Sequence, residues 1–130
     1  MILFDTDVCI EILRGNKKVI SKRNHSDEPI SVSFITVAEL FYGSELSGNS
    51  EHNNSLVEEF LLTLNIIESD FTIMKRFALI KAYLKRNNIL LPDADIIIAS
   101  SALEKCNLLI TGNIDHFNQI PDLKMENWIR

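Results

Sequence analysis

Short apolar runs alternate along the chain with longer segments whose apolar residues recur at helical spacing. Continuous apolar or β-branched runs at residues 2–4, 30–35 and 108–110 predict strands that are buried on both faces, as in a parallel sheet. Weaker strands are predicted at residues 65–68 and within 122–130. Helical spacing predicts helices over residues 8–14, 17–25, 36–46, 51–64, 70–86 and 93–105. This alternation predicts an α/β fold with a central, mostly parallel sheet of four or five strands and helices on both faces.

Composition limits the class of protein. The chain has 130 residues, of which 46% are hydrophobic and 24% charged, so we expect one folded domain spanning residues 1–130 rather than disorder. The formal net charge of −5 argues against general attraction to nucleic acid or to an anionic membrane. No run approaches the ~20 apolar residues of a membrane span. The apolar start meets Asp5 with no basic stretch before it, so we expect no signal peptide and a soluble, cytoplasmic protein. Cys9 and Cys106 have no metal-ligand spacing, and we expect both to be reduced.

The acidic residues with informative positions follow predicted strands or begin predicted helices. They are Asp5 and Asp7 after the first strand, Glu39 in the helix after the second, Asp93 and Asp95 opening the helix before the 108–110 strand, and Asp115 after that strand. The carboxyl ends of parallel strands share one edge of a sheet, so these side chains are expected to converge. Clustered carboxylates repel one another, and a divalent cation such as Mg²⁺ or Mn²⁺ relieves the repulsion. Such an ion activates water and stabilises charge on a phosphate.

Most of these acids also have a purely structural interpretation, which is helix capping or interaction with the helix dipole. Asp7 is a candidate N-cap for a helix starting at Val8, Thr36 to Glu39 forms a T-x-x-E capping box, Asp93 is a candidate N-cap after Pro92, Asp95 complements a helix dipole, and Asp115 fits a loop turn. Asp5 has no capping role as direct as that of Asp7. Asp5 is therefore the strongest candidate for a functional acid.

Four segments carry motif-like patterns. Ile2–Val8 matches hhhDTNhhI except at Asp7, Ser33–Gly43 reads S-x-I-T-x-x-E-L-x-x-G, Asp95–Leu103 reads D-x-x-I-A-x-x-A-L, and Leu109–Phe117 reads hhT-x-[ND]-x-x-x-F. Together they resemble the signatures of PIN-domain nucleases over nearly the whole chain. The form of the second segment resembles the VapC-type ribonuclease toxins of toxin–antitoxin pairs.

This resemblance implies a three-layer PIN-like fold and a metal-dependent endoribonuclease that hydrolyses RNA phosphodiester bonds with metal-activated water. It implies Mg²⁺ or Mn²⁺ as the cofactor and Asp5, Glu39 and Asp95 as the ligands. Family members often have Asp at the place of Asn113, or at the place of His116 just before the phenylalanine. The fourth acidic position is therefore open between Asp115, Asn113 and a water-bridged Asp93.

Hydroxyls and one imidazole lie beside the predicted acids. By resemblance, Thr6 and Thr111 hold carboxylates or metal-bound water, although turn or cap hydrogen bonding explains them equally well. His116 is either a proton carrier or a packing residue at the surface.

Two stretches contain basic residues and no acids, and either suits a phosphate backbone. The first holds Arg14, Lys17, Lys18, Lys22 and Arg23, and the second holds Lys75, Arg76, Lys81, Lys85 and Arg86. We favour the first, because it follows the helix that begins near Asp5, and assign RNA binding to Arg14, Lys17, Lys18 and Lys22. A solvated helix face is the alternative for both.

The resemblance also implies partners: a homodimer, and a small antitoxin whose C-terminal segment crosses the active groove. Several aromatic residues are expected to pack in the core, with some left on an apolar surface for these partners: Phe41, Tyr42, Phe60, Phe71 and Phe77.

Two other functions fit parts of the sequence. Asp5-Thr6-Asp7 resembles the D-x-D motif of haloacid-dehalogenase-type phosphatases, with Asp5 as the covalent nucleophile, but the late acidic pair of that family is missing after Ile110. A catalytically inactive PIN-like scaffold that binds RNA or protein would explain the missing fourth Asp.

Overall fold

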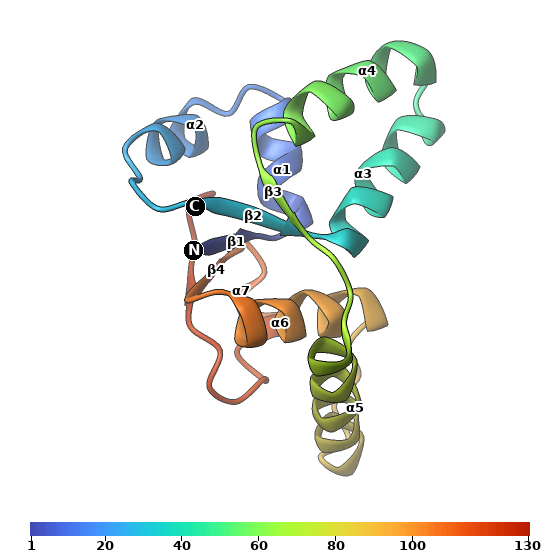
Figure 1. The fold of residues 1–130 in the computed structure, drawn as a ribbon, viewed down its shortest axis with the longest axis vertical. Coiled ribbons are helices and arrows are strands. Elements are labelled where there is room, and N and C mark those ends of the chain that lie inside the picture. The colour runs from blue at the N-terminus through green and yellow to red at the C-terminus, as the bar shows by residue number, and fades with distance from the viewer.

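The computed structural model describes residues 1–130, and its centre is one sheet of five short strands, all parallel (Figure 1). The strands lie in the order β3-β2-β1-β4-β5, so β1 is in the middle. Their bounds are β1 Ile2–Phe4, β2 Ile30–Ser33, β3 Asn65–Ile67, β4 Leu108–Ile110 and β5 Met125–Glu126. Every pairing is parallel, so the carboxyl ends of all five strands lie at one edge.

Seven helices connect the strands and cover both faces of the sheet. They are α1 (Thr6–Leu13), α2 (Lys17–Asn24), α3 (Phe34–Leu46), α4 (Ser50–Leu61), α5 (Phe71–Arg86), α6 (Asp93–Lys105) and α7 (Ile114–Phe117). Figure 1 shows α1 to α4 on one side of the sheet and α5 and α6 on the other. The predicted α/β architecture, with helices on both faces of a parallel sheet, is confirmed.

Alternation of side chains along the central strands produces two cores. Leu3 and Leu109 pack in a core with residues of α5 and α6, whereas Ile2, Phe4 and Ile110 pack in a core with residues of α1 to α4. The five strand residues are almost fully buried, with at most 1% of their surface exposed. This two-sided burial explains the continuous apolar runs in the sequence.

The N-caps of three helices differ from the sequence-based predictions. The N-cap of α1 is Asp5, whose Oδ1 accepts a hydrogen bond from the Thr6 backbone N–H at 2.7 Å. The interpretation of Asp7 as the N-cap, with a less direct capping role for Asp5, is therefore wrong. The N-cap of α3 is Ser33, so α3 begins two residues before Thr36 and the predicted capping box does not form. Pro92 holds the N-cap position of α6, and Asp93 is its first residue rather than its cap.

The structure also bears on the helix after β4, on the two cysteines and on membrane-spanning helices. The short helix α7 was not predicted, and it carries Asp115 and His116. Cys9 is buried, Cys106 is half-buried, and neither forms a disulfide. No helix combines the length and the apolar character that crossing a membrane requires.

Candidate active site

Asp5 lies at the end of the central strand and is held on both carboxylate oxygens. Its side chain is buried, with 4% of the residue exposed. Oδ1 accepts the hydrogen bond from the Thr6 N–H, and Oδ2 accepts one from the Thr111 hydroxyl at 2.7 Å. Thr111 follows β4, and the Asp5 N–H donates to the Ile110 carbonyl at 2.9 Å, so the ends of β1 and β4 fix this carboxylate together.

Burial in the first place, and the charge of Asp7 in the second, raise the pKa of Asp5 from 3.8 to about 7. The hydrogen bonds from Thr111 and Thr6 act in the opposite direction, and the charge of Asp95 adds to the increase. Burial likewise raises the pKa of Asp7, whose Oδ2 accepts a hydrogen bond from the Gly112 N–H at 2.9 Å while its buried Oδ1 has no partner. This pair of carboxylates is electrostatically unsatisfied, and a cation at this edge would favour its ionised form.

Glu39 is connected to Asp5 through Thr6. The Thr6 hydroxyl donates to Glu39 Oε1 at 2.7 Å, and its oxygen lies 3.0 Å from the Thr36 hydroxyl. Thr6 and Thr36 stand at the starts of α1 and α3, so these contacts join the two helices where they leave the sheet. The same side chain of Glu39 lines a groove between α1, α3 and α4, with a volume of about 370 Å³.

Asp95 comes from the first turn of α6 and faces α7. Its Oδ2 lies 3.3 Å from His116 Nδ1, and 19% of its side chain is exposed. Figure 1 shows the start of α6 on the same side of the molecule as the junction between β2 and α3. The predicted convergence of Asp5, Glu39 and Asp95 at one edge agrees with this arrangement. The side chains do not, however, form a preassembled group of three metal-ligating residues.

The chemistry of the donors at this edge suits Mg²⁺ or Mn²⁺, because it consists of carboxylate oxygens without a thiolate. Asp7 contributes a second, half-buried carboxylate beside Asp5. Asp5 is held in place by its two hydrogen bonds, whereas Glu39 contacts Thr6 and Asp95 contacts His116.

Two independent similarities identify the family. The family model described as PIN domain matches residues 2–123. Ribonuclease VapC2 of Haemophilus influenzae is 33% identical over 128 residues, which cover 98% of this chain and 97% of the relative. The chain belongs to the VapC group of the PIN-domain family. This membership confirms the resemblance seen in the sequence and replaces the phosphatase interpretation of Asp5-Thr6-Asp7.

Other VapC proteins match over the same extent. The tRNA(fMet)-specific endonuclease VapC of Salmonella typhimurium is 30% identical over 127 residues, covering 97% of this chain and 96% of the relative. The crystal structure of VapBC2 from Rickettsia felis, bound to a DNA fragment from its promoter, aligns with a TM-score of 0.92 and 29% identity. That alignment covers 98% of this chain and 99% of the other. The five-stranded parallel sheet and its helices are thus the fold of this VapC structure.

The candidates for the fourth acidic position lie around this centre without touching Asp5. Asp93 is exposed and forms an ion pair with Lys81 at 2.9 Å. Asp115 is exposed on α7 and lines a cleft of about 470 Å³ together with Asn113 and His116. The Asn113 N–H donates to the Thr111 hydroxyl at 2.9 Å. The hydroxyl that holds Asp5 is therefore itself held by the loop after β4.

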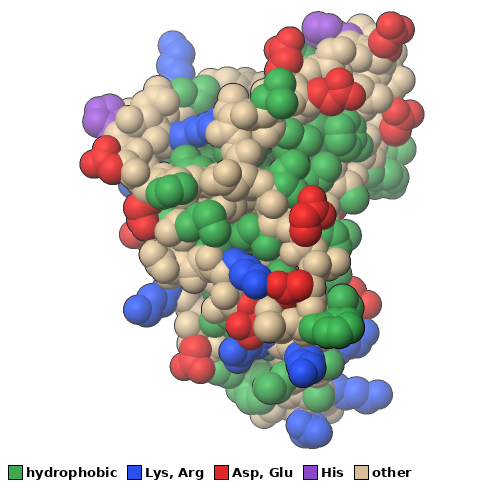
Figure 2. Space-filling model, in the orientation of Figure 1, with side chains coloured by type: hydrophobic (Ala, Val, Ile, Leu, Met, Phe, Trp, Pro, Cys, Tyr) green, Lys and Arg blue, Asp and Glu red, His purple; other side chains and the backbone are tan.

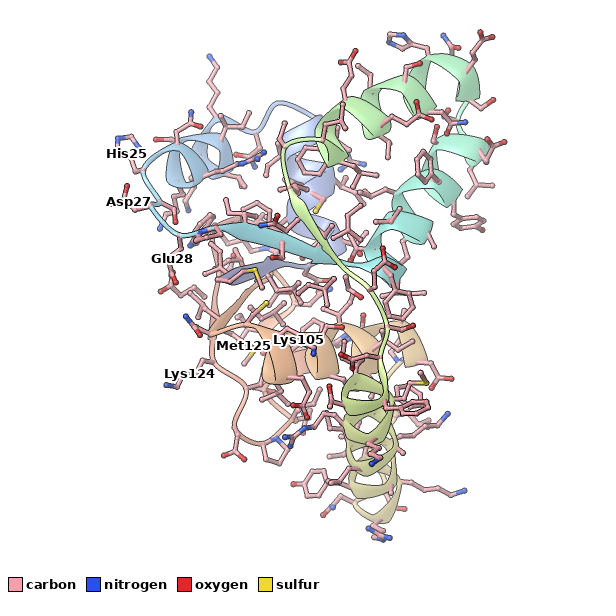
Figure 3. All side chains as sticks on the ribbon, viewed as in Figure 1. His25, Asp27, Glu28, Lys105, Lys124 and Met125 are labelled. Carbon is pink, nitrogen blue, oxygen red and sulfur yellow. The ribbon has the colours of Figure 1, made fainter.

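The two basic stretches occupy different ends of the molecule. Figure 1 places α2, with Lys17, Lys18 and Lys22, toward the end of the sheet opposite the start of α3, and in Figure 3 Asp27 lies at the same end. Arg14 is the member of this stretch that reaches the groove lined by Glu39. The second stretch lies on α5, over which basic side chains gather in the lower part of Figure 2, and the Lys81–Asp93 ion pair joins it to the start of α6.

Two residues at this edge, Gly112 and Arg130, were not among the site residues predicted from the sequence. Gly112 follows Thr111, and a Cβ at this position would lie 2.8 Å from Asp7 Oδ2 and 2.9 Å from Arg130 Nη1. The place of Gly112 inside the fourth motif was a usable signal. No local pattern pointed to Arg130, because it meets the site from a distant part of the chain.

Proposed function

We propose that the protein is a metal-dependent endoribonuclease and the toxin of a type II toxin–antitoxin pair. The observation that carries this proposal is the buried Asp5 carboxylate, which the Thr6 N–H and the Thr111 hydroxyl hold at the carboxyl edge of the sheet in a VapC fold. The names of the VapC relatives, a ribonuclease and a tRNA endonuclease, support RNA as the substrate.

In this proposal Asp5, Asp95 and Glu39 hold Mg²⁺ or Mn²⁺. When bound, the ion supplies activation of water and stabilisation of the charge on the phosphate. Thr111 and Thr6 orient the Asp5 carboxylate, and Thr6 also holds Glu39. Hydrogen bonds of this kind fix the direction of a ligand and tune its basicity.

Asp115 is the first choice for the fourth acidic position, with Asn113 and Asp93 as alternatives. Asp115 shares its cleft with His116, which contacts Asp95, whereas Asp93 is engaged by Lys81. Asp115→Asn should lower both cleavage and the number of Mn²⁺ ions bound per chain. Undiminished cleavage would remove Asp115 from the site.

We propose two partners, an antitoxin and a second copy of this chain. A toxin–antitoxin complex from Klebsiella pneumoniae aligns with 93% of this chain at 27% identity, with a TM-score of 0.75. The groove between α1, α3 and α4 is half apolar in its lining, and Figure 2 shows hydrophobic side chains gathered over α3 and α4 at the upper right. Tyr42 and Leu46 of α3 are 66% and 70% exposed, and Phe71 of α5 is 78% exposed, so part of the aromatic set lies at the surface as predicted.

The decisive experiment is cleavage of structured RNA by the purified protein with Mn²⁺, compared with an EDTA control. Asp5→Asn should abolish cleavage and leave the fold intact. Asp27→Asn is the matched control, because Asp27 is an exposed loop residue far from the site (Figure 3). Metal-independent cleavage, or full activity of Asp5→Asn, would contradict the proposal. RNA binding without cleavage would favour the inactive scaffold instead.

A further inference from the structure

The segment from Asn127 to Arg130 is fixed against the strand that carries Asp5. Trp128 is 6% exposed, and its ring packs edge-on against Phe4, with centroids 5.5 Å apart and planes at 75°. The indole N–H donates to Glu126 Oε2 at 3.0 Å. The Asn127 side chain closes a turn, because its Oδ1 accepts from the Ile129 and Arg130 backbone N–H groups at 2.8 and 3.0 Å. Arg130 is therefore directed by an anchored turn.

The guanidinium of Arg130 contacts the loop that holds Asp5. Its Nη1 donates to the Gly112 carbonyl at 2.8 Å. On the other side of the same residue, the Gly112 N–H donates to Asp7 Oδ2 at 2.9 Å. The neighbouring Thr111 hydroxyl donates to Asp5 Oδ2 at 2.7 Å. Arg130, Gly112, Thr111 and Asp5 thus form a continuous chain of hydrogen bonds and one covalent link.

The absence of a side chain at Gly112 shows how closely these groups approach. A Cβ built there would lie 2.8 Å from Asp7 Oδ2, 2.9 Å from Arg130 Nη1 and 2.9 Å from Ile129 Cδ1. Distances under 3.0 Å are shorter than carbon atoms tolerate, so a side chain here would displace the ends of Asp7, Arg130 and Ile129. Glycine at this position therefore lets Asp7 and Arg130 keep their contacts with the backbone of the loop.

We propose that Arg130 is a positioning residue, which holds the Thr111–Asn113 loop and through it keeps Asp5 in place for metal binding. The inference rests on the proposed function, since it assigns Arg130 to the same metal site. Removal of Arg130 frees the Gly112 carbonyl, loosens the loop and lets the Thr111 hydroxyl leave Asp5. A planar guanidinium suits this role, because it has several fixed donors and stays charged.

The test compares wild type with Arg130→Gln and Arg130→Lys. Lys124→Gln is the matched control, because Lys124 is exposed in the same C-terminal part of the chain and points away from the molecule in Figure 3. Three quantities are measured: the hydrogen-exchange rate of the Gly112 amide in metal-free protein, the Kd for Mn²⁺, and kcat and KM for RNA cleavage.

Arg130→Gln should accelerate exchange of the Gly112 amide and weaken Mn²⁺ binding roughly 10-fold, the lower end of what loss of a supporting contact costs at metal sites. The value of kcat should fall with it while KM stays constant. Arg130→Lys, which can still donate to the Gly112 carbonyl, should recover part of each loss, and Lys124→Gln should behave as wild type.

Several results would overturn the inference. A raised KM with unchanged Mn²⁺ affinity would show that Arg130 contacts RNA directly. Unchanged exchange at Gly112 and unchanged Mn²⁺ affinity, with only a lower Tm, would make Arg130 a purely structural residue. If the wild-type protein neither binds Mn²⁺ nor cleaves RNA, the proposed function fails, and this inference fails with it. Failure of the inference alone is recognised by an active wild type and an equally active Arg130→Gln.

Discussion

Replacement of Asp5 by Asn should stabilise the metal-free protein at alkaline pH while removing its function. The pKa of Asp5 is about 7 in the folded chain, against 3.8 for an unperturbed carboxyl. Between these values the unfolded chain releases this proton and the folded chain keeps it. The free energy of unfolding therefore falls as the pH rises through this window, and levels off above it. The raised pKa of Asp7 acts with the same sign.

The shift of Asp5 corresponds to roughly 4 kcal/mol, at ~1.4 kcal/mol per pKa unit. Asparagine keeps the contact with the Thr6 N–H through its own oxygen. Its amide can donate to the Thr111 hydroxyl, which reverses that hydrogen bond and costs about 1 kcal/mol. The net gain for Asp5→Asn at pH 8 is therefore about 3 kcal/mol. At roughly 3–5 °C per kcal/mol for a chain of this size, Tm should rise by about 10 °C.

Thermal unfolding in EDTA at pH 4 and pH 8 measures this difference, with Asp27→Asn as the control. The variant should exceed wild type in Tm at pH 8 and lose that advantage at pH 4, where Asp5 is protonated in the folded state. Saturating Mn²⁺ should stabilise wild type by a few kcal/mol, about 2.7 kcal/mol at 100 times Kd, and leave Asp5→Asn unchanged. If Asp5→Asn has no higher Tm than wild type at pH 8, or the same Tm advantage at pH 4 and pH 8, then ionisation of Asp5 does not destabilise the folded protein.

Three other changes have defined outcomes. Glu39→Gln should lower kcat at least 10-fold. Its Tm should change little, since the new amide oxygen still accepts a hydrogen bond from Thr6. A loss of folded protein large enough to explain the whole decrease in kcat would argue against Glu39 as a metal ligand. Gly112→Ala should lower Tm and Mn²⁺ affinity together, because its Cβ lies within 3 Å of Asp7 and Arg130, and unchanged Mn²⁺ titrations would show that the loop adapts. Reversal of Lys17, Lys18 and Lys22 to Glu should weaken RNA binding and flatten its dependence on salt; an unchanged slope would leave α5 as the RNA-binding element.

The architecture could be predicted from the sequence because its strongest signals are local. The runs Ile2–Phe4 and Leu108–Ile110 are too apolar for a strand with a solvent face, so they required a sheet covered on both sides. The position of acids directly after such strands indicated the edge of the sheet at which we propose the active site. The resemblance to PIN-domain motifs then separated Asp5, Glu39 and Asp95 from the remaining acids.

Features that depend on tertiary contacts could not be predicted in this way. Asp5 caps α1 and also lies near the other acids, so one side chain combines the capping role with the proposed role in metal binding, which the sequence presented as alternatives. Helix α3 begins earlier than expected because the Ser33 hydroxyl accepts a hydrogen bond from the Ile35 N–H, which makes Ser33 the N-cap in place of Thr36. Arg130 reaches Gly112 across 18 positions through a turn that no local pattern announces.

Metal binding by Asp5 is best tested with a crystal of the protein soaked in Mn²⁺, in which the ion is located by its anomalous scattering. We expect an Mn²⁺ ion at the carboxyl edge of the sheet, coordinated by the Asp5 carboxylate with Asp95 and Glu39 turned toward it, and no ion there in Asp5→Asn. An ion bound elsewhere would contradict the proposed metal site. So would the absence of an ion at saturating Mn²⁺, with Asp95 still in contact with His116.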